Sequence, residues 1–514
     1  MDFSCASLDN TRLIFNRNFT GKQTVERPSV DDYFGDWKAR EALAQEMLPI
    51  MGKLENEKGV QIFLYGRTLN NRSVANIMKS HRRVREVARN ELSEFESSLV
   101  LKALAKLPLC PAQIDLGKLT VSYMEALEKD PEVDLDALVA SELDHLLGVD
   151  YQPVNKPTDI VLYGFGRIGR LVTRLLVEQT GNGRLMRLRA IVVRKAGDGD
   201  LEKRVNLLRN DTVHGTFSGT VRIDEENNRI IANGNVIQII YANSPDTIDY
   251  TEYGIDDALV IDNTGIWRDE EALGQHLKSK GVSKVMLTAP GKGNLKNIVF
   301  GINDNTITPE DKIISAASCT TNAIAPVLKQ INDKYGIVHG HVETVHAYTN
   351  DQNLIDNFHK ADRRGRSAPL NMVLTETGAA KAVSKAVPEL EGKLTGNAVR
   401  VPVANVSIAI LNLTLINESS VDEINEYLRN FALYSPLQNQ IGYTESPDAV
   451  SSDFIGSREA CTVDATATKV NGKNMILYLW YDNEYGYSAQ VVRMVNMMAG
   501  VKFLTYPENV FMAN

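Results

Sequence analysis

The sequence predicts an α/β protein with a parallel-sheet unit and an α+β unit whose sheet is mostly antiparallel, preceded by a mainly helical N-terminal region. Three observations lead to this prediction. Helix formers and helical spacing of apolar residues dominate the beginning of the chain. Apolar strands and helical segments then alternate, which is typical of a parallel sheet covered on both faces. Beyond Cys319 the strands are longer, rich in β-branched residues and partly alternating, as in antiparallel sheets.

Composition excludes several classes of protein. With 514 residues, the chain is long enough for two or three domains. Its formal charge of −9 argues against nucleic-acid binding, and a solvated helix face explains its best basic patch, "KSHRRVREVAR", about as well as a binding site does. The four cysteines are scattered without metal-ligand spacing, so we expect no metal site and a reducing compartment. Neither a signal peptide nor a membrane-spanning run is visible, so we expect a cytoplasmic protein without a membrane partner.

Residues 1–155 are expected to form the helical region. In "DWKAREALAQEML", Asp36 is the predicted N-cap of a helix. In "DLDALVASELDHLLG", a stripe of apolar side chains ends at Gly148. We interpret this stripe as core rather than as a surface for a partner. Its members are Leu135, Leu138, Val139, Leu143, Leu146 and Leu147.

Two further units are expected after the proline-containing linker "YQPVNKPTD". Residues 156–317 contain the alternating strands and helices, beginning with "DIVLYGFGRIGRLVTRLLVEQ". Residues 318–483 contain the antiparallel type of strand, for example "GHVETVHAYT" and "VSIAILNLTLI". The helix expected at 484–500 returns to complete the parallel-sheet unit.

A glycine turn follows the first strand of the parallel-sheet unit. Gly164, Gly166 and Gly169 form G-x-G-x-x-G between an apolar strand and an amphipathic helix, which is the context that a dinucleotide site requires. The first glycine permits the tight turn, the second lets a pyrophosphate approach the backbone, and the third allows helix and strand to pack closely. The helix N-terminus then faces the phosphates.

The end of the second strand, in "IVVRKAGDGD", bears on the choice between NAD and NADP. NAD sites usually place an acid here to bind the ribose hydroxyls. Arg194 and Lys195 stand in its place, and cations suit the 2′-phosphate of NADP. Alternatively, the loop faces solvent and Asp198 or Asp200 supplies the acid. The sequence therefore predicts NAD or NADP, with Arg194 slightly favouring NADP.

Cys319 is the candidate nucleophile. It stands in "SAASCTTNAIAPV", among hydroxylated residues that a buried structural cysteine would not need. A thiolate near neutral pH requires a partner, and His346 in "TVHAYTNDQ" offers an imidazole. Clustered arginines, in "HKADRRGRS" and at Arg400, supply the forked donors that a doubly phosphorylated intermediate requires.

Six motifs together resemble one family. "GFGRIGR", "SCTTN", "HAYTNDQ", "TGAAKA", "KLTGNAVRVP" and "WYDNEYGYS" follow one another in the order found in phosphorylating glyceraldehyde-3-phosphate dehydrogenases. The resemblance covers roughly residues 158–500 and leaves out the N-terminal region. It implies a Rossmann-type nucleotide domain, a catalytic domain and a homotetramer. It also implies reversible oxidation of glyceraldehyde 3-phosphate to 1,3-bisphosphoglycerate with NAD(P) and inorganic phosphate.

The resemblance further implies roles for individual residues. Cys319 would attack the aldehyde and carry a hemithioacetal and then a thioester, with His346 as base. Thr349 and Arg400 would hold the substrate phosphate. The attacking phosphate would be held by Ser318, Thr320, Thr377 and Gly378, with Arg364 close by. Cofactor contacts would come from Arg167, Ile168, Thr264, Thr288 and Asn483, besides the glycine turn.

The chain departs from the family pattern at several positions. Tyr163 replaces a common asparagine, Asn357 and Phe358 replace a Leu-Pro pair near the adenosine ribose, and Ala323 replaces a frequent second cysteine. Bulky Phe358 argues against NADP, in opposition to Arg194. Two alternatives stay open: an erythrose-4-phosphate dehydrogenase, and a regulatory or binding protein that docks a partner through the N-terminal extension. The extension could equally stabilise the fold or shape the oligomer.

Overall fold

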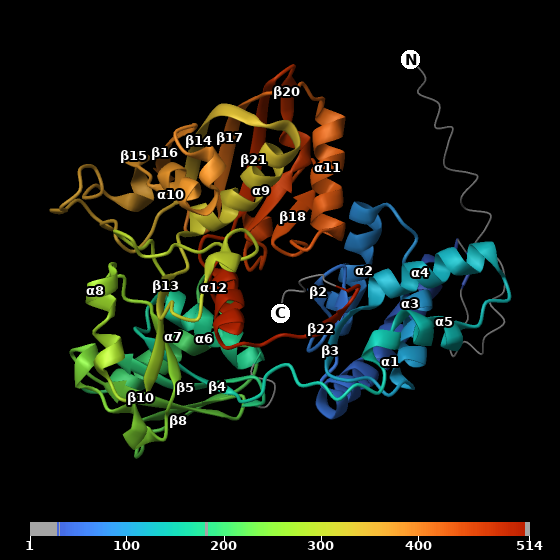
Figure 1. Cartoon of the computed structure of the whole chain (residues 1–514), viewed down its shortest axis with the longest axis horizontal. Coiled ribbons are helices and arrows are strands. Elements are labelled where there is room, and N and C mark those ends of the chain that lie inside the picture. The colour runs from blue at the N-terminus through green and yellow to red at the C-terminus, as the bar shows by residue number, and fades with distance from the viewer. Residues whose placement is uncertain (1–27, 30, 180–182, 509–514) are drawn as a thin grey trace.

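Five α-helices and a small sheet form the N-terminal unit of the computed structural model, which describes residues 28–29, 31–179 and 183–508. Figure 1 shows this unit in blue and cyan, to one side of the remaining chain. The expected mainly helical region is thus confirmed. Its helices are α1 (Tyr33–Lys58), α2 (Val74–Ala88), α3 (Glu94–Ala105), α4 (Leu116–Lys129) and α5 (Leu135–Glu142).

Two helix ends differ from the sequence-based prediction. The N-cap of α1 is Asp32 and not Asp36, since the Asp32 carboxylate accepts a hydrogen bond from the Gly35 amide at 2.8 Å. Helix α5 ends well before Gly148, because a 3₁₀ turn carrying Leu146 intervenes. Leu146 is buried in the core of this unit, so the apolar stripe is core as expected although the helix is shorter.

The sheet of the N-terminal unit is not predicted by the sequence analysis. Its strand order is β2-β1-β3-β22, and β22 is contributed by the end of the described chain, where it pairs in parallel with β3. Tyr506 of β22 is buried in the core of this unit. The N-terminal unit therefore needs both ends of the chain to complete its sheet. The strands are β1 (Gln61–Leu64), β2 (Arg67–Thr68), β3 (Ala112–Asp115) and β22 (Leu504–Tyr506).

A mostly parallel sheet forms the Rossmann-type unit, as predicted. Its order is β13-β12-β11-β4-β5-β10-β9-β8, and only the pairs that include β9 are antiparallel. The chain first builds outward from one side of β4, beginning with β5, and then from the other side, beginning with β11, so the sheet switches direction at β4. In sheets of this type, ligands bind at the carboxyl ends of the strands at that point. The strands are β4 (Thr158–Tyr163), β5 (Met186–Val193), β8 (Val221–Asp224), β9 (Arg229–Ala232), β10 (Asn235–Tyr241), β11 (Ala258–Asp262), β12 (Val282–Leu287) and β13 (Ile313–Ser315).

Helices complete the core of this unit. Helix α6 (Arg167–Gln179) follows the glycine turn, and α7 (Asp200–Arg209) follows β5. Helix α12 (Tyr485–Met498) returns from the unit that begins near Ser318, and its apolar residues join the core formed by β4, β5 and β11. Figure 1 shows α12 in red between the two larger units. A small pair of strands, β6 (Asn210–Asp211) and β7 (Gly215–Thr216), follows α7.

The third unit contains the residues for which the resemblance implies a catalytic domain, and we call it the catalytic unit. It is built on a mostly antiparallel sheet of order β15-β16-β14-β17-β21-β19-β18, with β20 paired to β21. Helix α9 (Cys319–Tyr335) packs its apolar side chains into the core of this sheet. Two further helices are α10 (Ala379–Ala386) and α11 (Val421–Tyr434). The strands are β14 (Ile337–Ala347), β15 (Val373–Glu376), β16 (Leu394–Val401), β17 (Ser407–Leu415), β18 (Ile441–Thr444), β19 (Cys461–Asp464), β20 (Lys469–Asn471) and β21 (Asn474–Tyr481).

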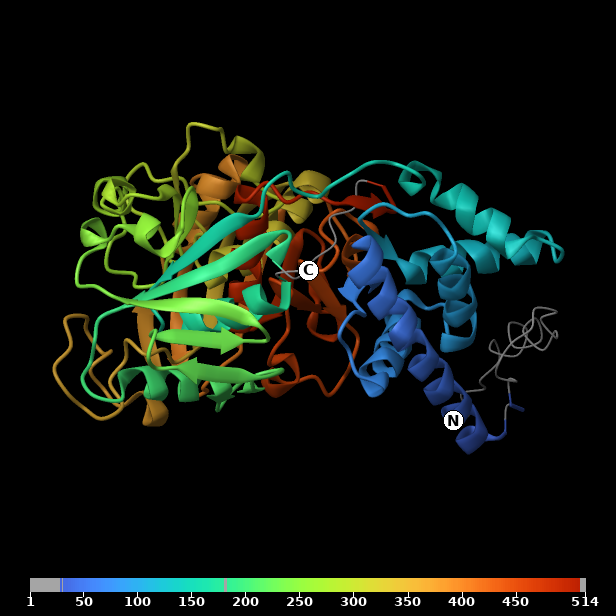
Figure 2. The same cartoon turned by 90° about the horizontal axis from the view of Figure 1, so that it is seen from below.

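The basic patch on α2 lies at the contact between the N-terminal unit and the catalytic unit, which Figure 2 shows side by side. Arg89 pairs with Glu445 at 2.8 Å, and Arg83 lies 3.9 Å from Glu459. Part of this patch therefore holds the two units together rather than facing solvent alone. Within the described ranges, no helix is both long enough and apolar enough to cross a bilayer.

Candidate active site

Cys319 lies where the two larger units meet. It is the first residue of α9 and packs against the hydrophobic cores of both units. Ser318 caps the helix, because its Oγ accepts a hydrogen bond from the Thr321 amide at 3.0 Å. Asn322 Nδ2 donates to the carbonyl oxygens of Ala316 at 2.8 Å and Ser318 at 2.9 Å. These bonds hold the thiol at the amino end of a helix, where the helix dipole stabilises a thiolate.

His346 is the side chain that faces this thiol. It lies near the end of β14, and its Nε2 is 3.5 Å from Cys319 Sγ. Its Nδ1 is 2.7 Å from the carbonyl oxygen of Ala347. A proton on Nδ1 suits that contact and leaves Nε2 as the acceptor that faces sulfur. The pair therefore has the geometry of a nucleophile and its base.

The surroundings favour an unprotonated histidine. Burial and the neighbouring charge of Arg400 lower the pKa of His346 to about 3. Burial raises the pKa of the Cys319 thiol, whereas Arg400 acts in the opposite direction and lowers it. Burial thus opposes a charge on both groups of the resting pair. His346 is then free to take the thiol proton as sulfur attacks.

Two arginines lie beside the pair. Arg400 lies opposite His346 in the β14–β16 register, and its Nη1 donates to Thr349 Oγ1 at 3.1 Å. Arg364 pairs with Asp351, which also accepts a hydrogen bond from the Thr349 hydroxyl. The Nε atoms of Arg364 and Arg400 are buried donors without an acceptor among the described residues. Such spare guanidinium donors suit an oxyanion.

The remaining residues predicted to bind phosphate are placed less directly. Thr320 is buried, and its hydroxyl lies 3.0 Å from the Tyr481 hydroxyl. Thr377 Oγ1 accepts a hydrogen bond from the Ala379 amide at 3.1 Å, next to Gly378 at the start of α10. In the part of the chain that the structure describes, no hydrogen bond joins Thr377 or Gly378 to the Cys319 thiol. Direct contacts therefore unite the nucleophile, the histidine, Arg400 and Thr349, while Thr377 and Gly378 stand at a neighbouring helix start.

The glycine turn has the geometry of a phosphate cradle. Gly164 has a φ of +98°, which favours glycine, and a Cβ on Gly169 would lie 2.5 Å from the Gly164 carbonyl oxygen. A Cβ on Gly166 would meet no atom within 4 Å, so the backbone there is open to a ligand. The amides of Arg167 and Ile168 begin α6 and lack partners within the helix. These residues fit the pyrophosphate of a dinucleotide.

Three further predicted cofactor residues lie just beyond the ends of strands β11, β12 and β21. Thr264 follows β11, and its amide and hydroxyl donate to the Asp262 carboxylate at 2.8 Å and 2.7 Å. Thr288 follows β12, and its hydroxyl donates to the Asp262 carbonyl at 3.1 Å. Asn483 Oδ1 accepts a hydrogen bond from the Ser407 hydroxyl at 2.9 Å, which leaves the amide nitrogen for a ligand. Ser407 was missed at the sequence level, where its only signal is one hydroxyl in an apolar strand.

Arg194 stands just beyond the carboxyl end of β5. It is exposed, and its guanidinium has no hydrogen-bond partner among the described residues. Of the two candidate acids, Asp200 is buried and its Oδ2 accepts from Arg204 Nε at 2.7 Å. Asp198 is exposed. This corner thus presents an unpaired cation, while the buried acid is already paired.

Two of the departures from the family pattern have different surroundings. Tyr163 packs edge-on against Trp267 and His276, with ring centroids 5.7 Å and 4.8 Å away. Burial raises the pKa of its hydroxyl to about 12. Phe358, in contrast, is 91% exposed.

A polar network lies behind the glycine turn. The Arg167 guanidinium pairs with Asp211 and with Glu484, which belong to different segments. His214 follows Asp211 closely, and its Nδ1 lies 3.3 Å from Arg167 Nη2. The network therefore connects the start of α6 to the segment that follows β21. The sequence analysis did not single out His214, whose neighbours in the chain carry no motif that it used.

Asp482 is the other end of this network. Its Oδ2 lies 3.0 Å from His214 Nε2, and its Oδ1 accepts from the amides of Glu484 at 2.9 Å and Tyr485 at 2.7 Å. The His214 ring stacks on Tyr485 with centroids 5.5 Å apart. Asp482 thus shapes the turn that carries Asn483.

Comparisons with known proteins show the family to which this chain belongs. The family model for the NAD binding domain of glyceraldehyde 3-phosphate dehydrogenase matches residues 158–270, and the model for its C-terminal domain matches residues 318–483. A glyceraldehyde-3-phosphate dehydrogenase-like protein of Pseudomonas aeruginosa strain UCBPP-PA14 is 58% identical over 463 residues, which is 90% of this chain and 100% of the relative. That match extends into the N-terminal unit.

Other relatives match a smaller part of the chain. A glyceraldehyde-3-phosphate dehydrogenase of Pseudomonas aeruginosa strain PAO1 is 39% identical over 67% of this chain and 98% of its own. The chloroplastic glyceraldehyde-3-phosphate dehydrogenase A of Zea mays is 39% identical over 69% of this chain and 87% of its own.

Proposed function

Since the chain belongs to the glyceraldehyde-3-phosphate dehydrogenase family, we propose that it oxidises glyceraldehyde 3-phosphate reversibly to 1,3-bisphosphoglycerate with NAD(P) and inorganic phosphate. The observation that carries this proposal is the 3.5 Å approach of Cys319 Sγ to His346 Nε2. The buried guanidinium of Arg400 lies beside the same pair, 3.0 Å from His346 Nδ1. A nucleophile, a base and an anion holder are therefore grouped where the two larger units meet.

The chemistry begins with the thiol. Cys319 Sγ attacks the aldehyde carbon while its proton moves to His346 Nε2, and a hemithioacetal forms. The resulting imidazolium gives its proton to the alkoxide oxygen, and the neutral imidazole then takes that proton back as base when the carbonyl re-forms, a contribution of about 10²–10⁴-fold in rate. When bound, the nicotinamide supplies the hydride acceptor. The thioester left on Cys319 is then attacked by a phosphate oxygen, the C–S bond breaks, and the thiolate departs beside His346.

Two phosphate positions follow from the proposed roles. Arg400 and Thr349 would hold the phosphate of the substrate, supported by their mutual 3.1 Å contact next to the pair. Ser318, Thr320, Thr377 and Gly378 would hold the attacking phosphate, with Arg364 close by. The unpaired Nε donors of Arg364 and Arg400 support both assignments.

The proposed cofactor is NAD or NADP, with NADP slightly favoured. An unpaired Arg194 at the end of β5 suits a 2′-phosphate, and the pairing of Asp200 with Arg204 removes one alternative ribose acceptor. Phe358 favours neither NAD nor NADP, since its side chain is exposed.

We also propose a homotetramer. The loop before β15 extends from the catalytic unit (Figure 1) and, with β15, exposes large apolar side chains. Such a group on one loop suits contact with a second copy of the chain. Its members are Leu354, Ile355, Phe358, Leu370, Met372 and Leu374.

A single-turnover experiment tests the role of the cysteine. With glyceraldehyde 3-phosphate and cofactor but no phosphate, the enzyme should release a burst of NAD(P)H near one equivalent per chain and hold an acyl thioester. Cys319→Ala should give no burst while still binding the cofactor. A normal burst from that variant would refute the assignment of the nucleophile. Equal bursts with erythrose 4-phosphate, without later acceleration by phosphate, would favour the alternative dehydrogenase.

A further inference from the structure

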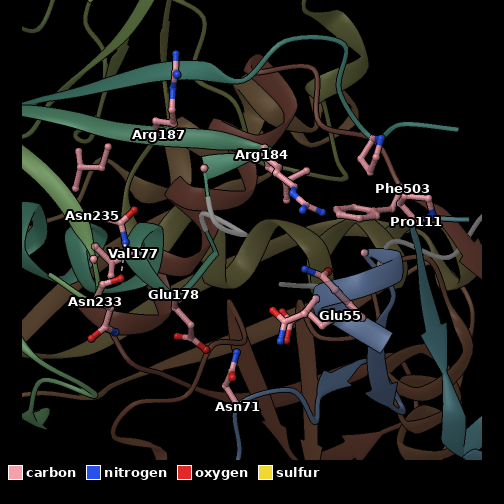
Figure 3. Close-up of a pocket in the computed structure, with 18 of the residues that line it drawn as sticks. Glu55, Asn71, Pro111, Val177, Glu178, Arg184, Arg187, Asn233, Asn235 and Phe503 are labelled. Atoms are coloured by element: carbon pink, nitrogen blue, oxygen red, sulfur yellow. Dashed lines mark hydrogen bonds between the residues drawn. The ribbon is translucent and has the colours of Figure 1, made fainter. Parts of the chain in front are cut away.

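A cleft of about 1360 Å³ lies between the N-terminal unit and the Rossmann-type unit (Figure 3). Its walls come from the end of α1, the turn after β2, the linker between the units, α6 and the segment around Arg458. None of the described residues that line it belongs to the proposed catalytic or cofactor-binding set. It is therefore a second cavity, whose own side chains must explain it.

Three arginines meet in this cleft from three parts of the chain. Arg72 comes from the N-terminal unit, Arg174 from α6 and Arg458 from the catalytic unit. Arg458 pairs with Glu178, and Arg72 Nη2 lies 3.9 Å from the same carboxylate. Glu178 is seen in Figure 3 on the wall of the cleft, close to Asn71. Two guanidinium groups, those of Arg72 and Arg458, thus lie beside one carboxylate, and Arg174 lines the same cleft.

Arg174 forms no ion pair within 4 Å in the described chain. It lies one helical turn before Glu178 on α6, and its Nη2 donates to the carbonyl oxygens of Leu208 at 2.8 Å and Gly215 at 3.0 Å. Carbonyl oxygens satisfy its hydrogen bonds, and the nearby charge of Asp211, which acts to raise the pKa of Arg174, compensates only part of the effect of burial. Arg184 lines the same cleft, is exposed, and has no hydrogen-bond partner among the described residues.

The positive charge around Glu178 is only partly balanced. Nη1 of Arg458 is a buried donor without an acceptor in the described chain. Burial lowers the pKa of Arg174, and burial together with the charge of Arg458 lowers that of Arg72. The opposing acid, Glu55, has a raised pKa, first because it is buried and then because Glu178 repels its charge. Removing cations from water without full compensation is unfavourable, and an added anion would correct it.

We propose that Arg72, Arg174 and Arg458 form a binding site for a small phosphate-bearing anion. Arginine forks recognise phosphate oxygens through paired N–H donors, and these three line one cleft from three parts of the chain. Because the three arginines belong to different units, a bound ligand joins the N-terminal unit to the Rossmann-type unit and the catalytic unit. This site does not depend on the proposed catalytic activity.

Isothermal titration of the full chain with inorganic pyrophosphate tests the proposal. The background variant Arg400→Gln removes the anion holder of the active site, and pyrophosphate binding should persist in it. Adding Arg174→Gln should weaken this remaining binding at least tenfold. Arg72→Gln, on the opposite wall, should do the same. The matched control is Arg82→Gln, an exposed arginine of α2 paired with Glu86 at 2.8 Å, which should change binding less than twofold.

The outcomes separate this site from the others that attract phosphate. All of these variants keep the glycine turn and any pyrophosphate binding there, so differences in affinity among them report on binding in the cleft. Circular dichroism and size exclusion verify that each variant folds. Because Arg72 and Arg174 belong to different units, the proposal can still be tested if one of the two variants fails to fold. Unchanged affinity in both Arg72→Gln and Arg174→Gln, or no binding in the Arg400→Gln background, would overturn the proposal.

Discussion

His214→Ala is expected to destabilise the protein by about 2–4.5 kcal/mol. The imidazole lies 3.0 Å from the Asp482 carboxylate and stacks on Tyr485 with centroids 5.5 Å apart. A hydrogen bond to a charged group contributes roughly 1.5–3 kcal/mol, and an aromatic pair contributes roughly 0.5–1.5 kcal/mol. The sum is large because the imidazole and Asp482 are both buried, so water does not replace the lost partner.

The same substitution should impair the cofactor site. Asp482 accepts hydrogen bonds from the amides of Glu484 and Tyr485 at the start of α12. Asn483 lies between Asp482 and these two residues in the chain. We expect a lower kcat and a higher KM for the cofactor, with the KM for the aldehyde nearly unchanged. His214→Gln keeps an N–H donor and should recover part of both losses. The control is His341→Ala, whose side chain is 41% exposed.

Urea denaturation and initial-rate kinetics measure both effects on the same proteins. A change in the free energy of unfolding below about 0.5 kcal/mol, the range of ordinary surface substitutions, would refute the reasoning. So would a His214→Gln variant that is as impaired as His214→Ala.

Three further predictions concern the cofactor, the nucleophile and the chain end. Arg194→Asp should shift the ratio of kcat/KM values for NADP and NAD at least tenfold toward NAD; an unmoved ratio would mean that Arg194 does not contact the 2′-phosphate. Arg400→Gln should raise the pKa of the Cys319 thiol, because Arg400 lowers it; the pH dependence of iodoacetamide alkylation should therefore move upward, and a downward shift would contradict the account. Deleting residues 501–514 removes β22 and should make the N-terminal unit sensitive to limited proteolysis, whereas deleting 509–514 should not; equal resistance of both would contradict a structural role for β22.

Local patterns explain what the sequence could predict. The glycine turn occupies six consecutive positions between a strand and a helix, and the structure keeps that arrangement. Cys319 and His346 belong to short motifs, each at the end of a regular element, so their environment could be expected from neighbouring residues. Their 3.5 Å approach required the structure, because it depends on how α9 and β14 pack.

Long-range pairing explains what the sequence could not predict. Strand β22 pairs with β3 through Leu504 and Ala112, and three-residue strands leave too weak a pattern to detect. Ser407 and His214 act through contacts with distant segments, and their own neighbours in the chain give little signal. The basic patch of α2 looked like a solvated face because its acidic partners, among them Glu445, lie in another unit.

The measurement that tests the central claim most directly is the initial rate with glyceraldehyde 3-phosphate and either NAD or NADP, at increasing concentrations of inorganic phosphate. The account predicts steady turnover that rises with phosphate and saturates, with 1,3-bisphosphoglycerate as product and no turnover by Cys319→Ala. Steady turnover without phosphate, or none with either cofactor, would contradict it.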